Sequence, residues 1–375
     1  MVMGPAAGLI LADLGADVIK VEPIGGDNTR RLSGSGAGYF AMYNRNKKSI
    51  CLDLKSPEGL KAAERLVQGA DIVIENFRPG AMDKLGLGFE VLSSVNPQLI
   101  YCSEKGFLAG PYEHRTALDE VAQMMGGLAY MTGPPGQPLR AGASVIDVMG
   151  GMFGVIGILA ALKQREQTGM GQHVKSALFE SSVFLVGQHM AQYAVTGQAA
   201  APMPVRISAW AIYDVFETGD GQQVFVGVVS DSQWIKFCRT FALDDWASNP
   251  DYVCNRDRVR HRDILMPKVR TLFQQFGKQE LMEKLEHIGL PFAPIARPED
   301  MASDPHLCSS GGLLSLNLPD GGTAELPALP LEMAGQKFGV RHDVPQIGQH
   351  TVEILEQMGY APEAIRKMWQ KPADQ

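Results

Sequence analysis

Residues 4–22, GPAAGLILADLGADVIKVE, decide the fold. Between residues 4 and 14 apolar side chains recur at helical spacing and Gly15 follows them, which predicts a helix that ends at this glycine. Residues 17–22 are rich in β-branched side chains and Pro23 follows them, which predicts a strand. A helix that leads into a buried strand is the second half of a βαβ unit. We therefore expect the first strand to lie upstream of this numbering or to come from elsewhere.

The same alternation continues as far as residue 103. Helices are expected at 57–68 and from 81 to 85, and strands at 71–77 and 99–103. Strands that alternate with helices are typical of an open, mostly parallel α/β sheet. A long apolar helix is expected at 149–165. Its glycines fit close helix packing and contact with a ligand about equally well.

The second half of the chain predicts a smaller α+β domain. A stretch rich in Pro and Ala at 198–204 is typical of a linker. Alternating residues at 209–216 and 223–229 flank a Gly/Asp turn and predict a hairpin. The helices expected after it in this domain lie at 261–276 and 278–288, and one more helix, expected at 348–360, can pack back on the first domain.

Composition excludes several classes of protein. Of 375 residues, 45% are hydrophobic and 20% are charged, which is typical of two globular domains rather than a disordered chain. The net charge of −7, without a block of Lys or Arg, argues against general nucleic-acid binding. The 5 cysteines include no C-x-x-C pair, which argues against a disulfide framework or a zinc ribbon and favours a reducing cytoplasm. No apolar run approaches about 20 residues, so we expect no membrane span.

Familiar catalytic motifs are missing from the sequence. Residues 34–38, GSGAG, lack the ending of a phosphate-binding loop and are expected to be flexible. No H-E-x-x-H occurs, so we expect no metal site, and the lack of G-x-S-x-G argues against an α/β-hydrolase.

Two acidic residues stand in apolar surroundings. Asp119 lies in ALDEVAQMMG (117–126) and Asp147 lies in GASVIDVMGG (142–151). A carboxylate in such surroundings is costly unless it is hydrogen-bonded or paired, and the N–H groups at a helix start can supply those bonds. From the residues alone, Asp147 is either an ordinary N-cap or a functional carboxylate.

Nearly the whole chain resembles the class III CoA-transferases, the CaiB/BaiF family that includes formyl-CoA transferase and carnitine CoA-transferase. The resemblance rests on the order and spacing of segments rather than on any one of them. These segments are 4–23, 27–30 (DNTR), 43–59 (YNRNKKSICLDLKSPEG), 71–80 (DIVIENFRPG), 85–88 (LGLG), 120–126 (EVAQMMG), 159–172 (LAALKQREQTGMGQ) and 348–351 (GQHT).

This resemblance implies an α/β fold with a Rossmann-like parallel-sheet large domain and a smaller α+β domain, in two chains interlocked as a homodimer. It implies a large domain at 1–197 and a small domain at 205–325, followed at 326–375 by a linker and a C-terminal helix that returns to the large domain. Connections at 198–204 and 326–340 are long enough for the chains to thread through each other. The active site is then expected where the large domain of one chain meets the small domain of the other.

The resemblance also implies an enzyme of the EC 2.8.3 type that moves CoA from an acyl-CoA to a small carboxylic acid. Asp147 matches the covalent nucleophile and Asp119 a supporting residue. A carboxylate can hold first an acyl group and then CoA, so no permanently bound cofactor and no metal is expected. The family's CoA-binding positions match Leu52, Leu54, Lys55, Asn76, Phe77 and Lys84. The two lysines would face phosphates, while Asn76 and Phe77 would hold the adenine or the pantetheine arm.

Two positions depart from branches of the family. Val2 stands where the formyl-CoA transferase branch has glutamine, and Leu118 stands where the racemase branch has histidine. The first departure argues against formate or oxalate as substrates, and the second against a two-base racemase. An acyl-CoA racemase or epimerase and a non-catalytic acyl-CoA-binding protein are the alternatives to a CoA-transferase.

Overall fold

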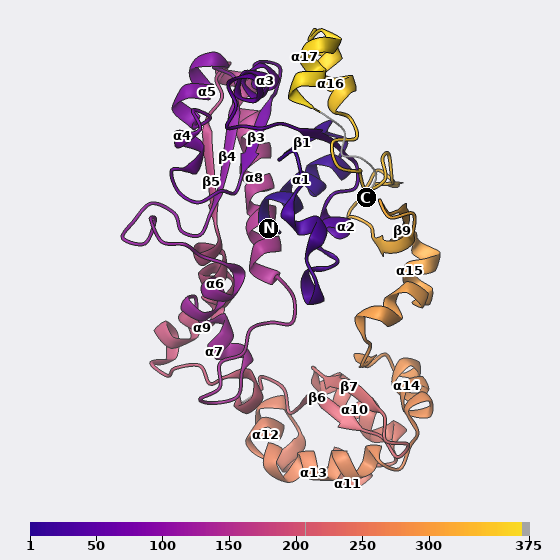
Figure 1. Cartoon of the computed structure of the whole chain (residues 1–375). Coiled ribbons are helices and arrows are strands. Elements are labelled where there is room, and N and C mark those ends of the chain that lie inside the picture. Colours follow the sequence, from indigo (N-terminus) through magenta and orange to yellow (C-terminus); the bar gives the residue numbers. More distant parts are fainter. Residues whose placement is uncertain (207, 370–375) are drawn as a thin grey trace. The chain divides into compact units, whose positions relative to one another are not determined.

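A computed structural model describes residues 1–206 and 208–369 of the chain (Figure 1). The chain divides into two compact units, Met1–Val205 with Asp304–Gln375, and Arg206–Ser303. The sequence placed residues 304–325 with the small domain, whereas in the structure they group with the large unit. The small unit is therefore an insertion in the large one.

The large unit begins with alternating helices and strands. Seven of its elements lie at or near positions that the sequence predicts: α1 (Met3–Asp13), β1 (Val18–Glu22), α3 (Pro57–Gln68), β3 (Ile72–Glu75), α4 (Ala81–Lys84), β4 (Ile100–Lys105) and α8 (Val145–Thr168). The structure adds α2 (Tyr39–Tyr43), β2 (Lys47–Cys51), α5 (Phe89–Val95), α6 (Asp119–Met125), α7 (Leu128–Thr132), β5 (His173–Ala177) and α9 (Leu178–Thr196).

The strands of this half form two parallel sheets. In the first, β1 pairs with β2, with Val18 opposite Lys47. In the second, the order is β3-β4-β5, with Ile72 opposite Ile100. The parallel pairing that the sequence predicts is confirmed, but the single sheet is wrong for the described residues, because no strand among them joins the two sheets. Instead α1 contacts β1, β2 and β3, so a helix connects the sheets by side-chain packing.

Side chains of β4, the central strand of the second sheet, alternate between two cores. Ile100 and Cys102 belong to a hydrophobic cluster shared with α1 and α8. Tyr101 belongs to a different cluster, formed with β2, α3, α16 and α17 (bounds below). Successive side chains of a strand point to opposite faces. Glu104 therefore faces the same layer as Ile100 and Cys102, the layer of α1 and α8.

Close packing accounts for the glycines of α8. A Cβ atom added to Gly151 would lie 2.7 Å from the carbonyl oxygen of Met3, which belongs to the backbone of α1. A Cβ atom on Gly154 would lie 2.7 Å from Oε1 of Glu104. Contacts this short do not occur for real Cβ atoms, so these positions favour the packing interpretation of the glycines over the ligand interpretation.

The length of α8 corrects one expectation from the sequence. This helix has 24 residues and is long and apolar enough to cross a membrane by length and composition alone. Of its most apolar window, 39% is buried, and the helix packs against α1, β4, β5 and α9. The core helix of a soluble protein passes the same test, and one side of α8 packs within the large unit while Met152, Ile156 and Leu159 are exposed.

The chain re-enters the large unit after the small one. The elements there are α15 (Pro305–Ser310), β9 (Leu313–Asn317), β10 (Thr323–Pro327), β11 (Glu332–Met333), β12 (Gln336–Lys337), α16 (Thr351–Gln357) and α17 (Pro362–Met368). The segment before α16 is tied to β2: Ser49 N donates to His350 Nδ1, and His350 N donates to the carbonyl oxygen of Ser49. Cys51 N donates to Thr351 Oγ1.

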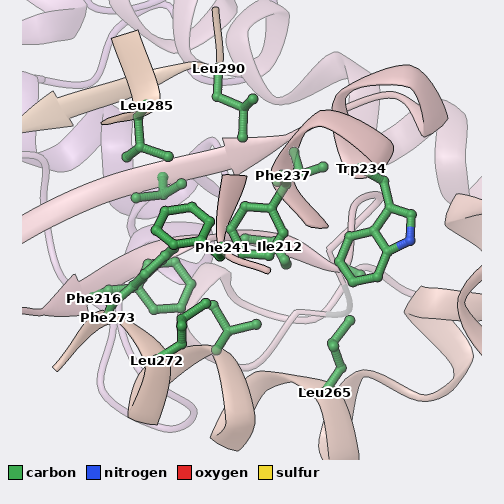
Figure 2. Packing of buried hydrophobic residues seen from close by; sticks show 14 of the residues in the cluster. Ile212, Phe216, Trp234, Phe237, Phe241, Leu265, Leu272, Phe273, Leu285 and Leu290 are labelled. Atoms are coloured by element: carbon green, nitrogen blue, oxygen red, sulfur yellow. The ribbon is translucent and has the colours of Figure 1, made fainter. Parts of the chain in front are cut away.

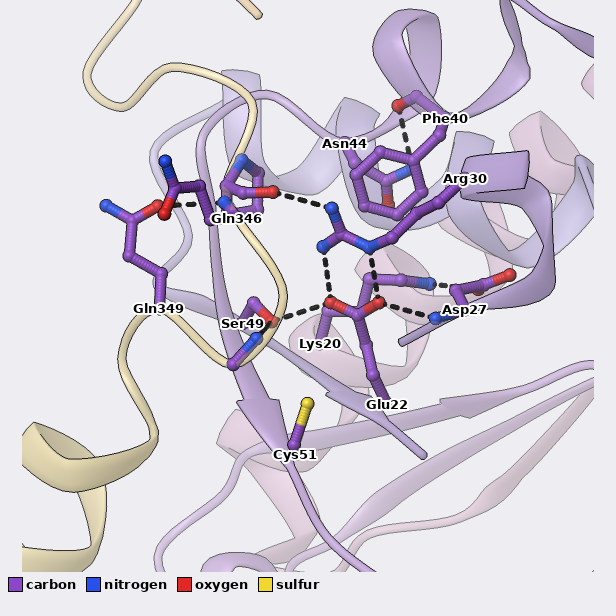
Figure 3. Close-up of polar contacts among 12 residues, drawn as sticks. Lys20, Glu22, Asp27, Arg30, Phe40, Asn44, Ser49, Cys51, Gln346 and Gln349 are labelled. Carbon is purple, nitrogen blue, oxygen red and sulfur yellow. Dashed lines mark hydrogen bonds and ion pairs between the residues drawn. The ribbon is translucent and has the colours of Figure 1, made fainter. Parts of the chain in front are cut away.

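A buried carboxylate joins this returning segment to the first sheet (Figure 3). Glu22 accepts hydrogen bonds from Arg30 at 2.6 and 2.8 Å and from Ser49 Oγ at 2.6 Å. Arg30 also donates to the carbonyl oxygen of Pro345 and lies over the Phe40 ring at 3.7 Å. Burial alone would raise the pKa of Glu22, but these partners hold the pKa below its usual value, so the carboxylate is charged and paired.

The small unit is an antiparallel sheet covered by helices. Its elements are β6 (Ile212–Glu217), β7 (Gln223–Val228), α10 (Asp231–Thr240), α11 (Asp244–Ala247), α12 (Asn255–Arg260), α13 (Arg262–Phe273), α14 (Lys278–His287) and β8 (Phe292–Pro294). The expected hairpin is present as β6 and β7, and β8 pairs with β7. Figure 2 shows the aromatic core, in which Phe216 and Phe237 pack around Phe273 and Trp234 stacks on Phe237. The α+β composition expected for this part of the chain is observed.

Candidate active site

Asp147 lies in the first turn of α8 and is half-buried. The N-cap position belongs to Ser144, so the interpretation of Asp147 as an N-cap is wrong. A carboxylate inside the first turn is close to the free N–H groups of the helix, and the partial positive charge there favours its ionised form. The carboxylate of Asp147 is therefore partly accessible at the start of α8.

The start of α8 is capped by a residue of another helix. Asp119, the first residue of α6, accepts hydrogen bonds at Oδ2 from Ile146 N at 2.9 Å and from Asp147 N at 3.0 Å. Its other oxygen accepts from Gln123 Nε2, and Gln123 Oε1 accepts from Ala141 N at 2.8 Å. Asp119 and Gln123 are both buried. The two carboxylates that the sequence singled out thus lie together, and Asp119 holds the backbone that carries Asp147.

Burial is the largest influence on the charge of Asp147 and raises its pKa to about 6. Asp119 and Glu120 add to the increase, while the N-terminal amine and Arg140 oppose it. Arg140 is itself ion-paired with Glu120. At pH 7 the carboxylate is mostly ionised, which is the state that a nucleophile requires.

Tyr43, in α2, also lies within the electrostatic reach of this pair. Its pKa is raised by burial first and then by the charge of Asp147, with a smaller contribution from Asp119. The phenol is therefore protonated at neutral pH and is available as a hydrogen-bond donor.

The candidate CoA-binding residues follow the carboxyl ends of β2 and β3. Leu52 is 2% exposed, so its side chain belongs to the core. Leu54 packs against the same hydrophobic cluster, and Lys55 is exposed. Phe77 is 53% exposed, and Lys84 is exposed at the end of α4. In open α/β sheets, ligands bind outside the carboxyl ends of the strands, where these residues lie.

Asn76, the remaining candidate, lies against α1. A Cβ atom on Gly4 would be 3.1 Å from its Oδ1 and 3.3 Å from Oε2 of Glu104. Asn76 and Glu104 therefore border the same small space at the start of α1.

Sequence reasoning missed Gln123, Tyr43 and Glu104. Gln123 is four positions after Asp119 on one helix, a spacing that places both side chains on the same face, so this partner was available from the sequence. Glu104 follows Ile100 and Cys102 at a spacing of two, which in a strand places all three side chains on the same face, so its position on the buried face was available as well. The position of Tyr43 depends on packing between distant segments. Among residues 1–206 and 208–369, no group of three or more His, Cys, Asp or Glu side chains is arranged to hold a metal ion.

Comparison with known proteins identifies the family. A sequence model described as CoA-transferase family III matches residues 1–351. The chain belongs to this CoA-transferase family. It is 36% identical over 369 residues to a protein of Agrobacterium fabrum named succinate–glutarate CoA-transferase, covering 95% of this chain and 92% of the relative. It is 35% identical to an acyl-CoA transferase of Fusarium pseudograminearum, covering 97% of this chain and 83% of the relative.

Solved structures agree with these relatives. A crystal structure of a CaiB/BaiF family protein from Brucella suis matches with a TM-score of 0.82 and 33% sequence identity, covering 95% of this chain and 96% of that chain. The resemblance inferred from the sequence segments is thereby confirmed, and the chain is an enzyme of the CoA-transferase class.

Proposed function

We propose that this enzyme transfers CoA from an acyl-CoA to a carboxylic acid through covalent intermediates on Asp147. The observation that carries the proposal is the placement of Asp147, a half-buried carboxylate in the first turn of α8 with its backbone fixed by Asp119. A carboxylate in this position is ionised at neutral pH and can attack a thioester carbonyl.

The proposed reaction conserves a high-energy bond at every step. Asp147 attacks the acyl-CoA carbonyl, the carbon–sulfur bond breaks, and CoA thiolate leaves a mixed anhydride. The thiolate then attacks the side-chain carbonyl carbon of Asp147, which releases the donor acid and leaves an aspartyl-CoA thioester. The acceptor carboxylate repeats the two steps in reverse and regenerates the Asp147 carboxylate. No net proton, ATP or metal is consumed, so the chain's own task is to bind, orient and exclude water from the anhydride.

Small dicarboxylates are the proposed acids, because the Agrobacterium fabrum relative is named for succinate and glutarate. The exposed Lys55 and Lys84 are proposed to face the phosphates of CoA, and Asn76 with the exposed Phe77 to contact its adenine or pantetheine. CoA is a substrate in this proposal and not a resident cofactor. The free cysteines, Cys51 among them, support a cytoplasmic location.

An interlocked homodimer is proposed as the active form. Apolar side chains that are exposed in the single chain gather on two neighbouring helices, α8 and α9, which supports their burial in a dimer. They include Met152, Ile156 and Leu159 of α8 and Phe184, Met190 and Tyr193 of α9. Native mass spectrometry at nanomolar concentration tests this assembly, and an active monomer would contradict it.

Incubation with succinyl-CoA or acetyl-CoA and a panel of acids tests the function. Transfer of CoA between acids, with an adduct on Asp147 after hydroxylamine trapping or by mass spectrometry, is the expected result. Asp147→Ala should abolish transfer and leave CoA binding and folding nearly intact. An adduct on Asp119 or on a cysteine would contradict the mechanism. Hydrogen exchange at the α-carbon without transfer would favour a racemase, and binding without turnover would favour a binding protein.

A further inference from the structure

Glu104 is a buried carboxyl group to which neither the fold nor the proposed mechanism gives a task. It lies in the central strand β4 and is 2% exposed. Among the described residues, both of its carboxyl oxygens are buried without a hydrogen-bond partner. An ionised carboxylate is very costly in such a place, whereas its protonated form costs much less.

The space around this carboxyl group is created by two glycines. A Cβ atom added to Gly154 would lie 2.7 Å from Oε1 of Glu104, and a Cβ atom added to Gly4 would lie 3.3 Å from Oε2. Gly154 follows Asp147 by two helical turns on the same face of α8. The carboxyl group of Glu104 therefore lies between α8 and the start of α1, about 10 Å further along α8 than Asp147 and on the same face.

Charged groups from every neighbouring element act on Glu104. Burial is the largest influence and raises its pKa to about 8; Asp147 of α8 and Glu75 of β3 raise it further. The N-terminal amine of Met1 and Lys47 of β2 oppose these effects. Lys47 donates to backbone and amide oxygens elsewhere, and its own pKa is lowered well below the usual value by burial.

We propose that Glu104 is a positioning residue that keeps its proton during CoA transfer, so that its carboxyl group adds no negative charge to the site around Asp147. This inference rests on the proposed function. Glu104 does not touch the substrates, and its effect is on the charge of the site around Asp147.

The need for an uncharged group follows from the chemistry of transfer. Once Asp147 carries an acyl group or CoA, the species that must approach it are anions, namely the CoA thiolate and the acceptor carboxylate. An ionised Glu104 would repel both in a space of low dielectric. Asp147 must be ionised to react and Glu104 must be protonated. The activity is therefore expected to rise near pH 6 and to fall again near pH 8.

The test compares pH profiles of kcat/KM for glutarate, with succinyl-CoA as donor, in the wild type, Glu104→Gln and Glu104→Leu. Both variants should keep the rise near pH 6 and lose the fall near pH 8. The ratio of kcat/KM at pH 9 to that at pH 7 should therefore be about tenfold higher in each variant than in the wild type. Glu90→Gln, the same change at an exposed residue of α5, should keep the wild-type profile. A role in packing alone would lower activity by the same factor at every pH.

Failure of this inference and failure of the proposed function give different results. If the wild type shows no transfer at any pH with any acid of the panel, the proposed function fails and the inference fails with it. If the wild type is active and the alkaline fall persists in either variant, only the inference is overturned, because a group other than Glu104 then causes the fall. Unfolding of both variants would also overturn it, since the proposal holds that the site accommodates an uncharged side chain.

Discussion

Exchanging the carboxylate of Asp119 for an amide should break a closed set of hydrogen bonds. Asp119 accepts from two N–H groups of α8, those of Ile146 and Asp147, and from the side-chain amide of Gln123. Asparagine has one oxygen for the α8 groups, and its NH2 would then face the NH2 of Gln123. Turning the Gln123 amide round would direct its NH2 at the N–H of Ala141, which now donates to Gln123 Oε1. In either arrangement two donors face each other, and at least one buried donor stays without an acceptor.

The size of the effect follows from these groups. A buried donor left without a partner costs about 1–3 kcal/mol. Loss of a negative charge at a helix start costs about 0.3–1 kcal/mol more. Asp119→Asn is therefore expected to lower the free energy of unfolding by about 1–4 kcal/mol. Because the same bonds fix the backbone of Asp147, kcat should fall as well, while the covalent intermediate should still form.

A second substitution should restore what the first removes. In Asp119→Asn with Gln123→Glu, the new carboxylate can accept from the Asn NH2 with one oxygen and from Ala141 N with the other. Urea unfolding followed by circular dichroism should show the double variant more stable than either single one, since Gln123→Glu alone places two carboxylates against each other. The reasoning would be refuted if Asp119→Asn were as stable as the wild type, or if the double variant were no more stable than Asp119→Asn.

Three further predictions concern other parts of the large unit. Gly151→Ala should destabilise the fold by about 1–3 kcal/mol because its Cβ would meet the backbone of Met3, whereas Gly187→Ala in α9, with open space around it, should be neutral or stabilising in the same urea assay. Burial holds the pKa of Glu104 above its value in the unfolded chain, so its contribution to the free energy of unfolding is greatest below pH 4.5 and is lost as pH rises to about 8. The free energy of unfolding of Glu104→Gln should therefore rise relative to that of the wild type over this interval, by up to about 5 kcal/mol. The same difference in urea midpoint between variant and wild type at pH 5 and at pH 8 would contradict this. Lys55→Ala combined with Lys84→Ala should raise KM for the acyl-CoA severalfold without changing kcat, while Lys61→Ala, another exposed lysine, should leave both constants as they are.

Local patterns in the sequence were sufficient for part of the order of the elements. The helix at the start, the alternation to residue 103 and the hairpin of the small unit depend on spacing and on turn residues that act within a few positions. The division of the parallel strands into two sheets was not available, because it depends on how α1 fills the space between distant segments. Residues 304–325 were assigned to the small domain from the sequence, whereas they group with the large unit.

The candidate site shows the same limit. The surroundings of Asp147 were apparent from its apolar neighbours, and the resemblance supplied its expected role. What the sequence did not supply was the cap that Asp119 provides across two helices, since this bond joins positions 28 residues apart. Glu104 was overlooked because a glutamate at the end of a strand usually reaches solvent, and only the glycines of α1 and α8 enclose it.

The bonds between β2 and the segment before α16 also bear on how the chain is made. His350 follows its partner Ser49 by 301 positions, and the small unit is encoded between them. At about 5–20 residues per second, a ribosome needs about 15–60 s to reach that segment after β2 has emerged. During this interval the small unit can complete its core, while the large unit still lacks the apolar side chains of Ile354 and Leu355. The newly synthesised N-terminal half therefore spends that time with an uncovered apolar surface, which is the state that chaperones bind, until α16 has left the ribosome.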